Sequence, residues 1–112
     1  MKKKPTAEQR KRWRAAADPA RVRAATHKRT CKLYGITPAQ YAELLAKQGG
    51  GCAICGDPPT STRDLSIDHD HTTGKVRGLL CNCCNPGLGY FKDNESRLHR
   101  AIAYLRENKN AD

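Results

Sequence analysis

The chain of 112 residues has little from which to build an apolar core, since aromatic residues make up only 5% of it. No apolar run approaches the roughly 18 residues of a membrane span. The N-terminal sequence MKKKPTAEQRKRW has no apolar stretch after its lysines, such as a secretory signal carries. These absences argue against a membrane or exported protein and predict a cytoplasmic one. One small domain with so little apolar material is expected to need a further source of stability.

Six cysteines are present, and four of them supply that source. Two C-x-x-C pairs are separated by 25 residues, a spacing typical of a structural, tetrahedral zinc site in a reducing compartment. Because its four positions are closed by sulfur, this zinc is not expected to be the catalyst. The predicted ligands are Cys52, Cys55, Cys81 and Cys84. Cys31 and Cys83 have no assigned role.

The net charge of +10 lies entirely near the N-terminus. Residues 1–34 hold twelve lysines and arginines against two acids, whereas the remainder holds nine of each sign. Residues 1–35 therefore form a basic arm suited to the phosphates of nucleic acid, with a solubilising tail as the alternative interpretation. The bases predicted to contact nucleic acid there are Arg10, Lys11, Arg12, Arg14, Arg21, Arg23, Lys28 and Arg29.

Local patterns predict a small α+β protein. Capping residues and helix formers indicate helices over 7–17, from Asp18 to before Gly35, and from Thr37 to the three glycines at 49–51. Alternating residues and turn chemistry then predict a β-hairpin, with strands over 65–69 and 75–80 and its loop at the histidines. A short helical stretch through Tyr90 and a last helix capped by Asn94 follow. We expect residues 36–112 to form the zinc-stabilised domain.

The run Asp68-His69-Asp70-His71 brings together groups that phosphodiester hydrolysis requires. A neutral histidine can activate water near pH 7, and a carboxylate with an amide oxygen can hold a hard divalent ion. The alternatives are a polar hairpin edge, or histidines that act as zinc ligands. In a regular strand Asp68 and His69 point to opposite faces, so one site can use both only if the strand bulges or ends there.

At these residues the sequence resembles a known family. C-x-x-C-G, then DHDH, then GKVRGLLCNxCN from Gly74 to Asn85 (with Cys83 as an extra cysteine) is similar to phage recombination endonuclease VII, a family of His-Me finger, or HNH, nucleases. The resemblance covers residues 36 to about 91. It implies a ββα-metal core in which a hairpin and a helix hold one catalytic Mg²⁺ or Mn²⁺, supported by the separate zinc.

The resemblance also implies a role for each matching residue. His69 becomes the general base, Asp68 and Asn85 become ligands of the catalytic ion, and His71 contacts phosphate or stabilises the transition state. A helix cap is the alternative for Asn85. On the return strand Arg77 is placed to reach the scissile phosphate, with an exposed salt bridge as its alternative. Leu88 stands where the best-known member has an acid.

These expectations define a metal-dependent endonuclease acting on duplex or branched DNA in a phage or bacterial host cell. A homodimer is an allowed assembly, although the stretch after Asn94 is shorter than the region that the best-known member uses for dimerisation and four-way-junction binding. A non-catalytic zinc-finger protein that binds DNA is the alternative from another class. A protein that binds or cleaves RNA is a third, because a basic arm does not distinguish the two sugars.

Overall fold

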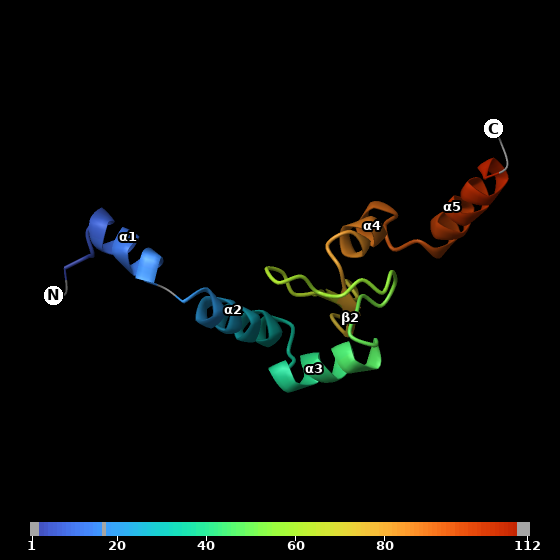
Figure 1. Ribbon diagram of the computed structural model, residues 1–112. Coiled ribbons are helices and arrows are strands. Elements are labelled where there is room, and N and C mark those ends of the chain that lie inside the picture. The colour runs from blue at the N-terminus through green and yellow to red at the C-terminus, as the bar shows by residue number, and fades with distance from the viewer. Residues whose placement is uncertain (1–2, 17, 110–112) are drawn as a thin grey trace. The chain divides into compact units, whose positions relative to one another are not determined.

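A computed structural model describes residues 3–16 and 18–109 and confirms a small α+β protein. In this part of the chain five helices accompany one two-stranded sheet (Figure 1). The chain divides into two compact units, residues 1–41 and 42–112. Among the described helices, none has the length and apolar character needed to cross a bilayer. The elements in order are α1 (Ala7–Ala16), α2 (Pro19–Leu33), α3 (Pro38–Lys47), β1 (Ser66–His69), β2 (Val76–Leu80), α4 (Cys84–Tyr90) and α5 (Glu95–Asn108).

The helix starts follow the capping residues that the sequence predicts. Thr6 and Gln9 form a reciprocal capping box at α1, with N···O distances of 2.9 and 3.1 Å. Thr37 and Gln40 repeat it at α3, with distances of 2.8 and 3.1 Å. The Asp18 carboxylate accepts the N–H of Ala20 at the start of α2. These helix starts are therefore fixed by local sequence. Residue 17, the expected end of the first helix, lies outside the described residues.

Cys31, which the sequence left without a role, belongs to the small core of the first unit. Its side chain is fully buried, and its sulfur lies 3.7 Å from Nε2 of His27 one turn earlier on α2. The His27 ring packs edge-on against buried Tyr41, with 4.3 Å between ring centroids. The basic arm thus contributes two side chains to a packed cluster with Tyr41, in addition to its charge.

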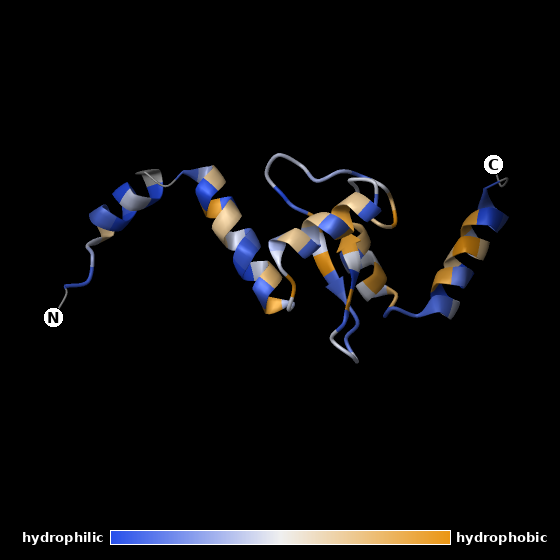
Figure 2. Cartoon of the chain, turned by 90° about the horizontal axis from the view of Figure 1, so that it is seen from below, coloured by the Kyte–Doolittle hydropathy of each residue, from blue (hydrophilic) through white to orange (hydrophobic). Residues whose placement is uncertain are grey.

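The core of the second unit lies at the hairpin. Leu65, Ile67, Leu79 and Leu80 are all buried, as the predicted alternation requires for the first two. The strands pair antiparallel, Ser66 with Leu80 and Ile67 with Leu79. In Figure 2 apolar residues gather around this hairpin, whereas α1 and α2 are mostly hydrophilic. Since the hairpin supplies most of this core, the residues at its tip are carried on the best-packed part of the unit.

Gln48 links the end of α3 to the second strand. Its Oε1 accepts the N–H of Leu79, and its Nε2 donates to the carbonyls of Leu79 and Gly51, all at 2.9 Å. The side chain thereby satisfies backbone groups on the open edge of β2, as a neighbouring strand would. Gln48 continues the i, i+3, i+4, i+7 spacing of Tyr41, Leu44 and Leu45, but its contacts are polar.

The last helix begins where Asn94 predicts it. The Asn94 side chain accepts the N–H of Arg97 at 3.0 Å. Its apolar face is present but is not covered within the described chain, because Ile102 and Leu105 keep 45% and 67% of their surface exposed. Periodicity therefore identified the helix correctly without indicating a packing partner.

Candidate active site and cysteine cluster

The two C-x-x-C pairs converge as their spacing predicts. The sulfurs of Cys52, Cys55, Cys81 and Cys84 all lie within 4.8 Å of one another, and those of Cys55 and Cys81 are 3.6 Å apart. Sulfurs bound to zinc at about 2.3 Å sit about 3.8 Å apart at the corners of a tetrahedron, so the four thiols fit such an ion. No histidine joins this cluster in the part of the chain described, which removes the histidine-ligand alternative.

Backbone N–H groups surround the cysteine sulfurs. Ile54, Asp57 and Cys84 donate to the sulfurs of Cys52, Cys55 and Cys81 at 3.4, 3.4 and 3.3 Å. Burial acts to raise the pKa of the Cys52 thiol, but N–H groups of the two cysteine pairs oppose this and lower it to about 6. In these two C-x-x-C turns, which we call the first and second knuckles, the N–H groups favour the thiolate of Cys52, the form that binds a metal, whereas burial raises the pKa of the Cys84 thiol.

A close backbone approach shapes the first knuckle. Gly51 is buried, and a Cβ at this position would overlap the carbonyl oxygen of Gly56. Gly56 itself has φ +81°, which glycine adopts without strain. The N–H of Ala53 bonds to the carbonyl of Leu79 at 3.1 Å, and β2 runs directly into Cys81. The second strand therefore connects both knuckles to the hairpin.

The hairpin contains the irregularity that a shared site requires. Asp68 pairs with Gly78, whereas the next residue, His69, pairs with Val76. Arg77 is thus an extra residue on β2, and such a bulge increases the local twist and redirects side chains. The regular alternation that would separate Asp68 from His69 is interrupted between those two residues.

The bulged Arg77 points its guanidinium at Asp68. Nε lies 2.7 Å from Oδ2 and Nη2 lies 3.0 Å from Oδ1, a bidentate pair. Nη2 also donates to Oδ2 of Asp93 at 3.2 Å. Hydrogen bonding to Asp68 is the main cause that raises the pKa of Arg77, so it stays protonated. Arg77 thus forms a salt bridge, which was the alternative interpretation of this residue. Its contact with a phosphate stays a prediction.

The two histidines at the tip lie together. The ring centroids of His69 and His71 are 4.9 Å apart, with an interplanar angle of 63°. His69 is half-buried at the end of β1, and His71 is exposed in the loop. Their proximity agrees with the two-residue period of a strand. The two imidazoles therefore lie side by side where β1 meets the hairpin loop.

Asp70, between the histidines, supports the loop. Its Oδ1 accepts the N–H groups of Thr72 and Thr73 at 2.8 and 3.0 Å. These bonds, that of Thr73 first, lower the pKa of the Asp70 carboxyl. The carboxylate therefore stabilises the turn that carries His71, and the stabilisation would be lost as pH falls through the lowered value.

Asn85 follows directly after Cys84 and lies inside α4. The N-cap of α4 is Cys83, so the helix-cap interpretation of Asn85 is wrong. The Asn85 side chain is half-buried and makes no hydrogen bond within the described residues. Its backbone N–H bonds to the carbonyl of Cys81 at 3.0 Å. The amide is thus fixed to the second knuckle and has an oxygen to offer a ligand. Its convergence with Asp68 stays a prediction.

Asp93 is the residue that sequence reasoning missed. It follows α4, and both it and Lys92 have positive φ values, 53° and 56°, that residues other than glycine rarely adopt. This turn places the Asp93 carboxylate beside Arg77, 16 positions earlier in the chain. The sequence carried one signal, an acid just before the Asn94 cap, but no local pattern indicated its partner.

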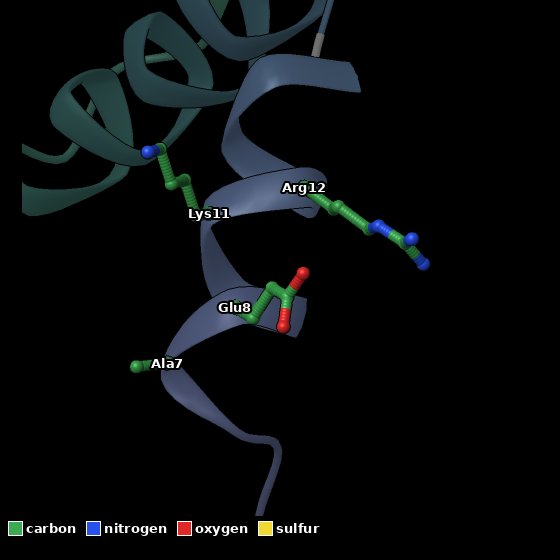
Figure 3. A pocket seen from close by; sticks show the side chains of 4 residues that line it. All are labelled: Ala7, Glu8, Lys11 and Arg12. Atoms are coloured by element: carbon green, nitrogen blue, oxygen red, sulfur yellow. The ribbon is translucent and has the colours of Figure 1, made fainter.

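The predicted nucleic-acid-binding bases of the arm lie on α1 and α2. All are exposed except Arg23, which is half-buried. A hollow along α1 is lined by Ala7, Glu8, Lys11 and Arg12, whose side chains project from a single helix in Figure 3. One helix surface does not enclose a ligand, so this hollow adds no site to the exposed positive charge.

The fold and the site define a small α+β protein with a cluster of four cysteines that could hold a metal ion and with a hairpin of acids and histidines. The sequence profile of recombination endonuclease VII matches residues 27–107, and the chain belongs to that family. It is 49% identical over 75 residues to the Gene 59 protein of Mycobacterium phage D29, covering 66% of this chain and 46% of that protein. Against the Gene 59 protein of Mycobacterium phage L5 the identity is 48% over 73 residues, covering 64% and 44%. The chain thus spans less than half the length of these two relatives.

Proposed function

We propose that this chain is a metal-dependent DNA endonuclease that hydrolyses phosphodiester bonds in duplex or branched DNA. The observation that carries the proposal is the register shift between Asp68 and His69, because a regular strand would direct the two side chains to opposite faces. The hairpin is followed in sequence by α4, the element order of a ββα-metal, or His-Me finger, core. Membership of the recombination endonuclease VII family supports the same activity.

In this mechanism His69 is the general base. It accepts a proton from a water molecule whose oxygen forms a bond to phosphorus, while the bond from phosphorus to the leaving sugar oxygen breaks. The leaving oxygen takes a proton from solvent. His71, whose ring lies beside that of His69, contacts a phosphate oxygen and stabilises the charge that builds on it.

Two metal ions have separate tasks in the proposal. Asp68 and Asn85 offer a carboxylate and an amide oxygen, the donors that Mg²⁺ or Mn²⁺ prefers, and this ion would supply positive charge to the phosphate and the leaving oxygen. The four cysteines would hold Zn²⁺, which keeps the knuckles rigid. Because Asn85 adjoins Cys84, the zinc would also fix the position of the Asn85 amide.

The basic arm supplies affinity in this proposal. Exposed lysines and arginines on α1 and α2 would neutralise backbone phosphates, which positions the chain on DNA without reading its sequence. Neither the arm nor the hairpin distinguishes DNA from RNA by these contacts. Whether one chain or a homodimer acts on the substrate is a question for measurements of mass in solution.

One observation favours a second candidate, a non-catalytic zinc-finger protein that binds nucleic acid. Both oxygens of Asp68 accept hydrogen bonds from Arg77, so this carboxylate already has a partner within the chain. In that case the ion pair would only brace the hairpin.

Nicking of supercoiled plasmid with Mg²⁺ or with excess EDTA separates the two candidates, with zinc content measured alongside. The endonuclease should convert supercoiled DNA to nicked or linear forms only with Mg²⁺, and His69→Ala should lower the rate by about two orders of magnitude or more. His99→Ala, which removes an exposed histidine on α5, is the matched control and should nick like wild type. No nicking by wild type, or equal nicking by His69→Ala, would refute the catalytic assignment. Linear duplex, four-way junction, single-stranded DNA and RNA run in parallel define the substrate.

A further inference from the structure

We propose that Asp93 is a positioning residue that holds Arg77 when Asp68 exchanges the guanidinium for a divalent cation. The inference rests on the proposed function for the presence of that cation. It adds a role for Asp93, and it makes Arg77 an internal competitor of the ion at Asp68.

The geometry of Asp68 leaves no carboxylate oxygen without a hydrogen bond. Both of its carboxylate oxygens accept from Arg77, at 2.7 and 3.0 Å. The Asp68 side chain keeps only 12% of its surface exposed, so little of it remains open to a second partner. A cation that binds Asp68 needs at least one of the same oxygens and repels the guanidinium. Arg77 and the cation therefore compete for one carboxylate.

Arg77 already has another acceptor. Its Nη2 contacts Asp93 at 3.2 Å while its Nε remains on Asp68. The guanidinium can therefore leave Asp68 by turning about the contact that it keeps. A protonated side chain that moved without a second carboxylate would lose its charge partner, which opposes release of Asp68.

Irregular backbone places both Arg77 and Asp93. Arg77 is the extra residue of the bulge. Asp93 lies in a turn with φ 53°, and its N–H bonds to the carbonyl of Leu88 at 2.9 Å. Left-handed conformations cost about 1–2 kcal/mol for most residues, although aspartate tolerates them better. Backbone strain of this kind is found where an exact side-chain direction serves a function.

The test is a double-mutant cycle on cation binding by the full-length, zinc-loaded protein without DNA. Mn²⁺ affinity is measured by electron paramagnetic resonance for wild type, Asp93→Asn, Arg77→Gln and the double variant. Asp93→Asn should weaken Mn²⁺ binding about threefold, the scale of a partly exposed ion pair, and Arg77→Gln should tighten it. In the double variant Asp93→Asn should have no further effect, because Asp93 acts through Arg77.

The control is Glu107→Gln, which removes an exposed carboxylate on α5 and should leave Mn²⁺ affinity unchanged. If Asp93→Asn weakens binding equally with and without Arg77, Asp93 is a direct ligand or acts through space, and the proposal is wrong. An unchanged affinity in Asp93→Asn also overturns it. Zinc content of one ion per chain confirms that each variant is folded.

A second measurement follows Arg77 directly. The NMR signal of its Nε–H should shift when Mg²⁺ is added to wild type, since this N–H faces Asp68. A signal that does not move contradicts the exchange. Mg²⁺-dependent nicking with an unmoved signal refutes only this inference. Absence of both nicking and Mn²⁺ binding in wild type refutes the proposed function and the exchange with it.

Discussion

Single side chains in this protein replace the packing that a larger core would provide. Gln48 makes three hydrogen bonds to backbone groups of Leu79 and Gly51. Leu79 is fully buried, and within the described chain no buried side-chain nitrogen or oxygen lacks a partner. Because a buried polar group without a hydrogen bond is costly, a single side chain that satisfies several of them makes a large contribution to the free energy of unfolding.

Gln48→Ala should therefore lower the free energy of unfolding by about 2 kcal/mol, because it leaves the N–H of Leu79 without its acceptor at the edge of β2, while the Leu79 carbonyl keeps only its bond from Ala53. Chemical denaturation of the zinc-loaded protein measures this. Gln40→Ala is the control, as it removes only the exposed capping contact of α3 and should cost about 1 kcal/mol or less. Equal losses of unfolding free energy in the two variants would show that the bonds of Gln48 to Leu79 contribute no more than an exposed helix cap.

The second knuckle offers a sharper residue-level prediction, because it contains three cysteines in four positions. The sulfur of Cys84 belongs to the metal-binding cluster, whereas Cys83 is exposed and caps α4 by its backbone position alone. Cys84→Ser should abolish stoichiometric zinc binding and the cooperative unfolding of the second unit. Cys83→Ser should retain one zinc per chain. Metal analysis with thermal unfolding checks both, and loss of zinc from Cys83→Ser would require a different ligand set.

At the scale of elements, the turn between α4 and α5 combines unfavourable backbone angles with the ion pair between Asp93 and Arg77. Lys92 adopts φ 56° and is exposed, so its backbone conformation is unfavourable without compensating burial of the side chain. Lys92→Gly should stabilise the protein by up to about 1 kcal/mol, measured by denaturation. Lys47→Gly, at the end of α3, makes the same change in a helical conformation and should destabilise by up to about 1 kcal/mol. Destabilisation by Lys92→Gly would mean that the turn is not strained.

The elements themselves could be predicted because their signals are local. Thr6, Asp18, Thr37 and Asn94 each cap the helix that follows, and the side-chain bonds that fix these starts span no more than three residues. The hairpin and its loop followed from alternation and turn chemistry in the same way. The cysteine spacing likewise predicted that the four sulfurs come together, because each C-x-x-C pair can direct two sulfurs toward one metal ion.

The site was less accessible to sequence reasoning because it depends on contacts distant in the chain. Alternation specified that the strand must bulge or end near Asp68, but not that Arg77 would be an extra residue opposite it. The pairing of Arg77 with Asp93 depends on a turn with positive φ at two successive residues, and of these only the aspartate is a residue type that tolerates this conformation. Gln48 continues the spacing of an apolar helix face, whereas its partner Leu79 lies 31 positions away. Resemblance to a family supplied roles for matching residues but gave none to Asp93.

For the whole molecule, the question is whether positive charge in the first unit provides binding to DNA. Deleting the arm is a poor test, because Cys31 and His27 pack with Tyr41 and their loss would expose a buried ring. Changing the α1 bases Arg10, Lys11, Arg12 and Arg14 to glutamine leaves that cluster intact. Each lost phosphate contact should reduce the slope of log affinity against log salt concentration by about 0.9, so the four changes should flatten it by up to about 3.6.

The matched control makes the same change of charge in the second unit. Converting the α5 bases Arg97, Arg100 and Arg106, together with Lys109, to glutamine removes four positive charges from exposed positions. If net charge alone attracts DNA, both variants should weaken binding and flatten the salt dependence equally. If the arm is the DNA-binding surface, the α1 variant should lose more of both, measured by fluorescence anisotropy of labelled duplex across a salt series. A slope that only the α5 changes reduce would move the binding surface to the second unit and leave the arm as a solubilising segment.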